Sequence, residues 1–242
     1  MQKIGEAHFE IEPSHCDNSG KASITHIYDL MQKIAAKHAN TNGFGYNDIT
    51  SSNLAWVLSR FGIFVNRYPA NEEKIKLITW VSAIDRFFTQ RNFACFDADD
   101  NIIAKAVSFW AGIDIKTRRP TNLIDIQNGS LLQVLTQPEQ DIVMPRLFKI
   151  PAVDTAPIKE YIPQYSDIDI NRHFNSIKYV EHALNLYSAD LLSGAFIESL
   201  EIVYLAEILP NMQIAFCKDG DIIDMKNLAD GKSMCRMRLH FK

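Results

Sequence analysis

One amphipathic helix decides how this chain folds, and its sequence is SITHIYDLMQKIAAKHAN, residues 23–40. Apolar side chains recur in it every three or four residues, which is the period of a helix with one buried face. They are Ile24, Ile27, Tyr28, Met31, Ile34 and Ala35. Asn42-Gly43 follows as a stop signal. The stretch therefore predicts a long helix whose apolar face must be covered by the rest of the fold.

Stretches with strand character flank this helix. A short one precedes it at residues 9–11, and turn residues such as Tyr68-Pro69 separate those that follow. The later stretches lie at 55–67, 74–84, 89–97 and 103–115. A long helix against one face of an antiparallel meander is an α+β arrangement.

The same order of elements occurs a second time. A strand-like stretch at 155–161 and a polar segment lead to a helix pattern over about residues 175–192. Strand-like runs follow at 196–206, 212–217, 222–227 and 233–241. Pro69 and Pro210 end comparable runs in the two halves, which indicates a duplicated unit.

A sheet wrapped around one long helix is the hot-dog arrangement, so the sequence predicts a double hot dog. We expect an N-terminal half over residues 1–128, a connection over 129–148 and a C-terminal half over 149–242. The connection is the stretch where the periodic pattern lapses, and it contains Gly129, Pro138 and Pro145.

Composition excludes several classes of protein. The 242 residues are 47% hydrophobic and carry a net charge of −4, without the basic excess typical of nucleic-acid binding. The sequence contains no apolar run of about 18 residues, so no membrane-spanning helix is expected. No signal peptide is expected either. The cysteines are scattered, which favours free thiols in a cytoplasmic protein over a zinc site or disulfides. Without a phosphate-binding loop or a metal-ligand cluster, we predict no cofactor and no metal.

The densest polar cluster is SDIDINRHFN, residues 166–175. Asp169, Asn171 and His173 alternate in it, so an extended backbone would place all three side chains on one face, just before a helix begins. Thioester hydrolysis needs a base for water and donors for the carbonyl oxygen, and a helix N-terminus offers such donors. Asp and Asn before a helix are also ordinary capping and turn residues, so the pattern alone leaves both interpretations open.

Glu207 is a second unusual position, because it interrupts an apolar run over residues 202–209. Such a carboxylate either faces solvent at a strand end or has a polar partner. If it points toward Asp169 and His173, one of the two nearby acids could hold a raised pKa and act as a base.

Residues 166–180 resemble the signature of the acyl-carrier-protein thioesterases, the plant fatty-acid-releasing enzymes and their bacterial relatives. In that signature Asp-Leu-Asp-Val-Asn-x-His-Val-Asn precedes Lys-Tyr. The first half carries further similar stretches, in the family's order. They are Asn53-Leu54-Ala55-Trp56-Val57, Arg67-Tyr68-Pro69, Thr79-Trp80-Val81-Ser82, Ala106-Val107-Ser108-Phe109-Trp110 and Lys116-Thr117-Arg118-Arg119-Pro120.

The resemblance implies hydrolysis of fatty acyl-acyl carrier protein to free fatty acid and carrier protein. It implies Asp169, Asn171 and His173 as catalytic residues, and Tyr204-Leu205-Ala206-Glu207, which is similar to the family's Tyr-Arg-Arg-Glu, adds Glu207. Plant members have a cysteine after that glutamate, once proposed as a nucleophile. Here the position is Ile208, so attack by an activated water is the better interpretation.

The matching place in the first half, residues 18–22, has no Asn-x-His, so we expect one active site per chain. The resemblance implies that the first half holds the acyl chain, and the candidate lining residues are Met31, Ile34, Trp56, Trp80 and Trp110. For each, ordinary core packing stays an alternative. Lys116, Arg118 and Arg119 are candidates for contact with an acidic carrier protein, or belong to a solvated strand end.

Three other functions stay open at this stage. One is an acyl-CoA thioesterase on the same scaffold, and another is a non-catalytic acyl-thioester binder. A hot-dog dehydratase fits the polar residues less well. The expected partner is an acylated carrier protein rather than nucleic acid or a membrane, and a homodimer stays open.

Overall fold

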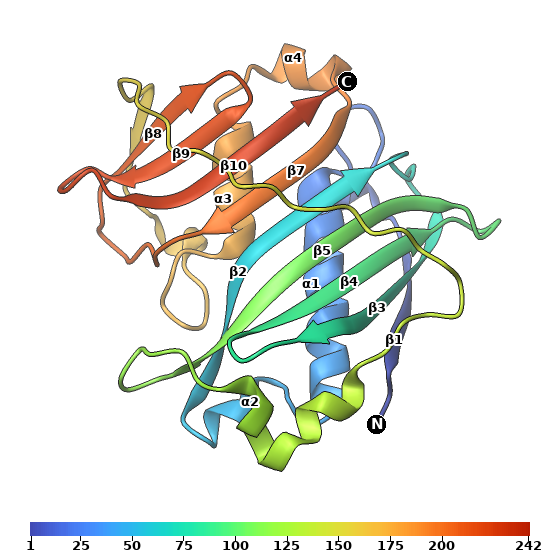
Figure 1. The fold of residues 1–242 in the computed structure, drawn as a ribbon. Helices are drawn as coiled ribbons and strands as arrows, with labels where there is room; N and C mark the ends of the chain where they lie inside the picture. The colour runs from blue at the N-terminus through green and yellow to red at the C-terminus, as the bar shows by residue number, and fades with distance from the viewer. The chain divides into compact units, whose positions relative to one another are not determined.

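The computed structural model covers residues 1–242 and describes the burial of all of them except Gly194. The chain forms two compact units, Met1–Arg146 and Leu147–Lys242, and each is described by itself (Figure 1). Among the described residues, no helix is both long enough and apolar enough to cross a membrane.

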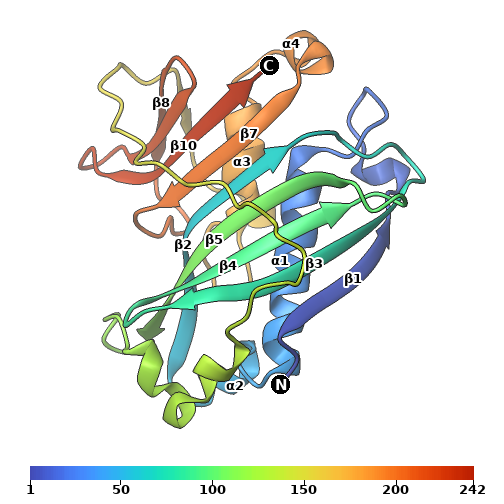
Figure 2. The ribbon, with the colours of Figure 1, turned by 45° about the vertical axis from the view of Figure 1, so that its right-hand side comes forward.

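The first unit is one antiparallel sheet with a long helix on one face (Figures 1 and 2). In the sheet the strands lie in the order β1-β3-β4-β5-β2. The elements are β1 (Ile4–Glu10), α1 (Ile24–Thr41), α2 (Tyr46–Thr50), β2 (Leu54–Val65), β3 (Lys74–Ile84), β4 (Phe88–Phe96) and β5 (Ile102–Asp114), followed by a kinked 3₁₀ segment, Leu123–Val134.

The long helix predicted over residues 23–40 is confirmed as α1. Ser23 caps it, because its side chain accepts a hydrogen bond from the His26 N–H at 3.2 Å. The predicted apolar face is buried, and Tyr28 meets the ring of Phe61 edge-on at 4.6 Å. Complete burial of one such side chain contributes roughly 1.5–3 kcal/mol, so this face holds the helix on the sheet.

The stretch in which we expected the connection lies largely with the first unit, which extends to Arg146. Leu131 and Val134 are buried in a cluster with Phe44, Val81 and Leu123. The backbone also forms a bridge between Val81 and Leu135, so this segment packs against the end of the first sheet.

The second unit repeats the architecture with shorter elements. Read from β6, its sheet has the order β6-β8-β9-β10-β7, which matches the order β1-β3-β4-β5-β2 of the first unit strand by strand. The elements are β6 (Lys159–Tyr161), α3 (Ser176–Leu184), α4 (Ala189–Gly194), β7 (Ile197–Tyr204), β8 (Ile214–Asp219), β9 (Ile222–Asn227) and β10 (Ser233–Phe241).

Two expectations about local structure are wrong. The continuous helix predicted over about residues 175–192 is broken, because α3 ends at Leu184 and Ser188 caps a new helix by accepting from the Leu191 N–H. The strands after each helix do not form a simple meander either, since β2 pairs with β5 and β7 pairs with β10. Strand order depends on which edges meet in the folded sheet, and periodicity carries no information about that.

A buried polar network fastens the segment just before β1 to α1 and β4. His38, 2% exposed, lies with Nδ1 3.1 Å from Arg91 Nη1 and with Nε2 2.9 Å from the Gln2 carbonyl oxygen. Because a guanidinium only donates, Nδ1 accepts and Nε2 carries the proton that is donated to Gln2. Burial and the neighbouring Arg91 charge lower the pKa of His38 to about 4, so the ring is neutral near pH 7.

This network predicts a loss of stability in mild acid. The unfolded His38 takes up a proton below about pH 6.5, whereas the folded one resists protonation down to about 4. The free energy of unfolding should therefore decrease as the pH falls from 6.5 to 4. In His38→Gln, the amide can accept from Arg91 and donate to Gln2 without titrating, so urea denaturation at pH 7, 6 and 5 should show a weaker decrease.

The matched control for this experiment is His8→Gln, because the His8 side chain is 69% exposed. This variant should keep the wild-type dependence on pH. A His38→Gln protein that loses as much stability in acid as the wild type would show that His38 is not responsible.

Candidate active site

Asp169 organises a closed turn before α3. Its N–H donates to the His173 carbonyl oxygen at 2.8 Å, and its carbonyl oxygen accepts from the Arg172 N–H at 3.0 Å. Its Oδ1 also accepts from the N–H groups of Asn171 and His173, at 2.8 and 3.1 Å. The prediction of an extended backbone here is therefore wrong. The carboxylate accepts hydrogen bonds from nearby N–H groups, and the chain bends around it.

His173 and Glu207 meet beside this turn. His173 Nε2 lies 3.5 Å from Glu207 Oε2, and the two side chains are 28% and 35% exposed. A backbone hydrogen bond of 2.9 Å from the Phe174 N–H to the Ile208 carbonyl oxygen joins the two loops. Phe174 and Ile208 are both buried, so this joint is protected from water. Glu207 is consequently turned toward the imidazole.

Tyr179 reports on both carboxylates. It is buried and packs edge-on against Phe174 at 4.8 Å. Burial raises the pKa of Tyr179, and negative charges at Glu207 and Asp169 contribute in the same direction. The charges of Glu207 and Asp169 thus both act on the Tyr179 hydroxyl.

The N-terminus of α3 completes the arrangement. Asn175 caps the helix, with its Oδ1 accepting from the Ile177 N–H at 2.9 Å. The first N–H groups of a helix create a positive potential that favours a developing negative charge. Asn171 donates its backbone N–H to Asp169, while its side chain is exposed at the tip of the turn. Two acids, an imidazole and a helix N-terminus are thus gathered in one part of the second unit.

A buried pair of side chains next to the turn, Asp167 and His182, is not among the candidates predicted from the sequence. Asp167 is 4% exposed, and its Oδ1 lies 3.1 Å from His182 Nε2. Its Oδ2 accepts from the Tyr161 hydroxyl at 2.6 Å and the Gln164 N–H at 2.8 Å. Burial raises the pKa of Asp167, but these hydrogen bonds outweigh burial and hold the pKa below its usual value. The available signal was an imidazole among the apolar positions Tyr179, Val180 and Ala183 of one helix.

The first unit contains the same turn without the same side chains. The Asp17 N–H donates to the Lys21 carbonyl oxygen at 2.8 Å, and Asp17 Oδ1 accepts from the Ser19 N–H at 2.8 Å. The Ala22 N–H donates to the Pro69 carbonyl oxygen, as Phe174 does to Ile208.

These hydrogen bonds give the register of the duplication. Lys21 occupies the place of His173, Ser19 that of Asn171, and Tyr68 that of Glu207. Pro69 corresponds to Ile208, so the prolines used to align the halves are offset. The first unit therefore has the fold of the candidate site but lacks the imidazole and the second acid.

The five candidate acyl-binding residues all lie in the first unit. Met31 and Ile34 are buried on α1, and Trp80 is buried with its indole N–H donating to Gln137 Oε1 at 3.2 Å. Trp56 and Trp110 are half-buried, and their indole N–H groups donate to the Phe44 carbonyl oxygen and to Ser108 Oγ, both at 2.9 Å. All three indoles are thus anchored by hydrogen bonds.

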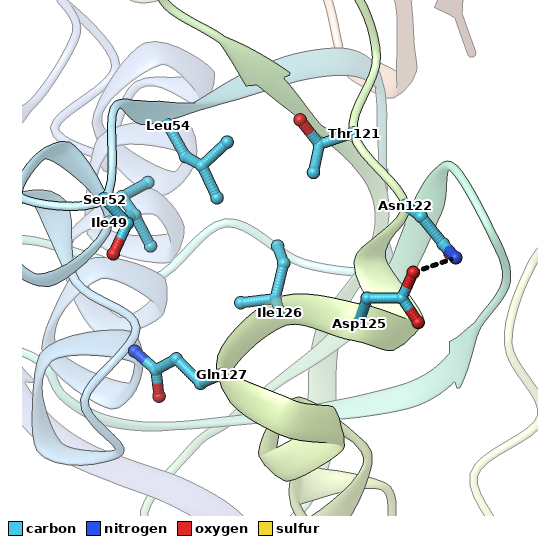
Figure 3. Close-up of a pocket in the computed structure, with 8 residues that line it drawn as sticks. All are labelled: Ile49, Ser52, Leu54, Thr121, Asn122, Asp125, Ile126 and Gln127. Atoms are coloured by element: carbon cyan, nitrogen blue, oxygen red, sulfur yellow. Dashed lines mark hydrogen bonds between the residues drawn. The ribbon is translucent and has the colours of Figure 1, made fainter.

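A cavity of about 210 Å³ opens in the first unit beside α2, at the start of β2 and over residues 121–127 (Figure 3). Apolar side chains of Ile49, Leu54 and Ile126 meet polar ones there, and Asn122 donates to Asp125 at 2.7 Å. None of the five candidate residues lines this cavity. It adjoins them through Trp56, which packs against the cluster that contains Ile126.

Lys116, Arg118 and Arg119 lie on an exposed turn after β5. Asp114 Oδ1 shapes the turn by accepting from the N–H groups of Lys116 at 3.0 Å and Thr117 at 2.7 Å. The arrangement fits both a contact surface and a solvated strand end. Across the described residues, no three His, Cys, Asp or Glu side chains are grouped so that they could hold a metal ion.

Two family models match the chain in sequence. The acyl-ACP thioesterase N-terminal domain matches residues 3–126, and the C-terminal domain matches residues 151–239. The oleoyl-acyl carrier protein thioesterase 2 of Arabidopsis thaliana is 25% identical over 218 residues, which are 84% of this chain. The chain spans 57% of the length of that relative.

Solved structures agree with these matches. An acyl-ACP thioesterase from Bacteroides thetaiotaomicron is 32% identical, with a TM-score of 0.86 over 99% of this chain and 98% of its own. The 12:0-ACP thioesterase from Umbellularia californica is 20% identical and superposes with a TM-score of 0.84 over 100% of this chain and 98% of its own, which is evidence for the fold. The family resemblance and the α+β double hot-dog fold predicted from the sequence are confirmed.

The matching turns of Asp17 and Asp169 predict different effects of substitution at one equivalent position, Gly20 in the first unit and Arg172 in the second. Arg172 has φ 63° and Gly20 has φ 75°, both in the left-handed region that favours glycine. Arg172→Gly should leave the free energy of unfolding unchanged or raise it by up to about 1 kcal/mol. Gly20→Ala, where an added Cβ would meet nothing within 4 Å, should lower it by about 1 kcal/mol through backbone strain alone. Urea denaturation measures both, and destabilisation by Arg172→Gly would contradict the equivalence.

Proposed function

We propose that this chain, which belongs to the acyl-ACP thioesterase family, hydrolyses the thioester of fatty acyl-acyl carrier protein and releases free fatty acid. The observation that carries the proposal is the contact between His173 and Glu207, 3.5 Å apart, beside the turn centred on Asp169. Thioester hydrolysis needs a general base for water and donors for the carbonyl oxygen, and both kinds of group are present there.

In the proposed reaction, water attacks the thioester carbonyl carbon and a carboxylate takes its proton. The carbon–sulfur bond then breaks, and the proton passes to the departing thiolate. Asp169 Oδ1 is engaged by two N–H groups, which leaves Oδ2 outside those bonds for the water. Glu207 orients the imidazole or shares the role of base, while His173, Asn171 and the first N–H groups of α3 polarise the carbonyl.

A cysteine nucleophile is not part of this proposal. The residue after Glu207 is Ile208, and Cys95, Cys217 and Cys235 are buried free thiols. Burial raises the pKa of Cys235 well above its ordinary value, which keeps it protonated and unreactive. Attack by water is supported because the acids and the imidazole lie together, while the buried thiols are inert.

We propose separate roles for the two units. The first unit holds the acyl chain with Met31, Ile34, Trp56, Trp80 and Trp110 as candidates, and the second carries the chemistry. The proposal rests on the matching turn of the first unit, since Lys21 and Tyr68 replace the imidazole and the second acid there.

Free cysteines are typical of the reducing cytoplasm, which we propose as the location.

Substitutions in the turn test the function directly. Asp169→Asn and His173→Ala should each lower kcat/KM for an acyl-carrier-protein thioester by about 10²- to 10⁴-fold, measured by release of free thiol. Thermal stability should change little in Asp169→Asn, because the amide oxygen of the new side chain can still accept from the two N–H groups that shape the turn. His173→Ala should also fold, since the turn uses only the backbone of His173.

Lys21→Ala is the matched control for these variants, because Lys21 occupies the place of His173 in the first unit. It should retain wild-type turnover. If the wild type releases no thiol, or if both substitutions in the second unit leave turnover intact, the assignment is wrong.

The basic turn after β5 offers a test of the carrier. Charge reversal at Lys116 and Arg119 should lower kcat/KM for the carrier-protein thioester, most strongly at low ionic strength. Turnover of the same acyl group on coenzyme A should change much less. Equal effects on both donors would argue against carrier contact, and faster turnover of the coenzyme A ester by the wild type would favour an acyl-CoA thioesterase.

A further inference from the structure

We propose that the buried Asp167–His182 pair is a positioning device that holds the turn of Asp169 and His173 in its working geometry. The proposal rests on the proposed function of that turn. The side-chain hydrogen bonds of the pair join Asp167 to His182, Tyr161 and Gln164, so the pair would act on the turn through the backbone and through packing.

The pair is connected to the turn at two points. The Asp167 carbonyl oxygen accepts the Asn175 N–H at 2.7 Å, which fixes the residue that caps α3. The His182 ring stacks on Phe174 at 5.5 Å between ring centroids. Phe174 directly follows His173, and its N–H holds Ile208, the neighbour of Glu207. A shift of the His182 ring would therefore move the backbone on both sides of the His173–Glu207 contact.

The carboxylate of Asp167 is held on both oxygens. Tyr161 at the end of β6 and Gln164 in the segment that follows bind Oδ2, and His182 binds Oδ1 from α3. Hydrogen bonds are directional, so this arrangement fixes the angle between that segment and the helix more closely than apolar packing would.

The first unit shows that the fold does not require this pair. Counted from the aspartate of each turn, Tyr161, Asp167 and His182 correspond to Phe9, His15 and Leu30. The first unit nevertheless makes the same backbone bond, from the Ser23 N–H to the His15 carbonyl oxygen at 3.0 Å. The first unit thus supports the same turn without a buried aspartate–histidine pair at these positions, and it is the unit that lacks the imidazole and the second acid.

Energetics favour the same conclusion. Burying a charged carboxylate such as Asp167 costs desolvation energy that its polar partners often fail to recover, and apolar replacements of buried charged groups are often as stable. A contribution to stability therefore does not explain why Asp167 and His182 are present. The exact placement of the turn explains it, because a displacement of about 1 Å in a reacting group can lower a rate by about 10²-fold.

Three substitutions test the proposal. His182→Leu installs the residue of the first unit and should preserve folding, but it should lower kcat by about 10- to 100-fold while KM changes by less than about 2-fold. His182→Gln should recover most of that loss, because its amide can donate to the same Asp167 oxygen. Asp167→Asn, which keeps the shape of the side chain, should resemble His182→Leu.

The control is Leu30→Ala, which disturbs the core at the matching place of the first unit. It should lower the melting temperature by several degrees and leave kcat per folded molecule unchanged. If the His182 variants behave in this way, the pair is merely structural and the proposal is overturned. Should His182→Leu fail to fold, Asp167→Asn and His182→Gln decide the question.

A measurement without substrate separates this proposal from the proposed function. The ring nitrogen resonances of His173, followed by NMR across a pH titration, should move in His182→Leu and Asp167→Asn but not in Leu30→Ala. If the wild-type protein has no thioesterase activity, the proposed function is wrong. The NMR titration would then still test whether the Asp167–His182 pair positions His173. Unchanged His173 resonances in both variants would overturn the positioning role.

Discussion

The backbone hydrogen bond from Phe174 to Ile208 is the interaction on which the candidate site depends. It joins the segment before α3 to the loop after β7 and so sets His173 beside Glu207. Both partners are buried, where an unpaired N–H or carbonyl group would be costly, so the bond is hard to break locally. The carboxylate of Asp169 adds the second constraint by closing the turn that precedes Phe174.

The same pair of constraints exists in both units, which separates architecture from chemistry. Asp17 closes the turn of the first unit, and Ala22 binds Pro69 as Phe174 binds Ile208. An aspartate therefore closes the turn before the helix in both units, so this role alone does not mark a catalytic residue. The polar groups that suit hydrolysis, His173 and Glu207, are what the second unit adds to this common framework.

The distribution of buried polar groups follows this division. In the first unit, the network of His38, Arg91 and Gln2 fastens the segment before β1 to the core. In the second, the pair of Asp167 and His182 lies against the turn that carries the candidate site. Each network is held by directional hydrogen bonds, so each defines one geometry where apolar packing would tolerate several.

The sequence by itself determined α1 and most strands, because periodicity depends on residues close together in the chain. For the site it indicated Asp169, Asn171, His173 and Glu207 as candidates, which stay a prediction. It did not determine the bend of residues 169–173, the break between α3 and α4, or the strand order. Only the tertiary structure brought Glu207 to His173 and Asp167 to His182. Those contacts join residues from different segments of the chain, and which of them form depends on the packing of the helix on the sheet.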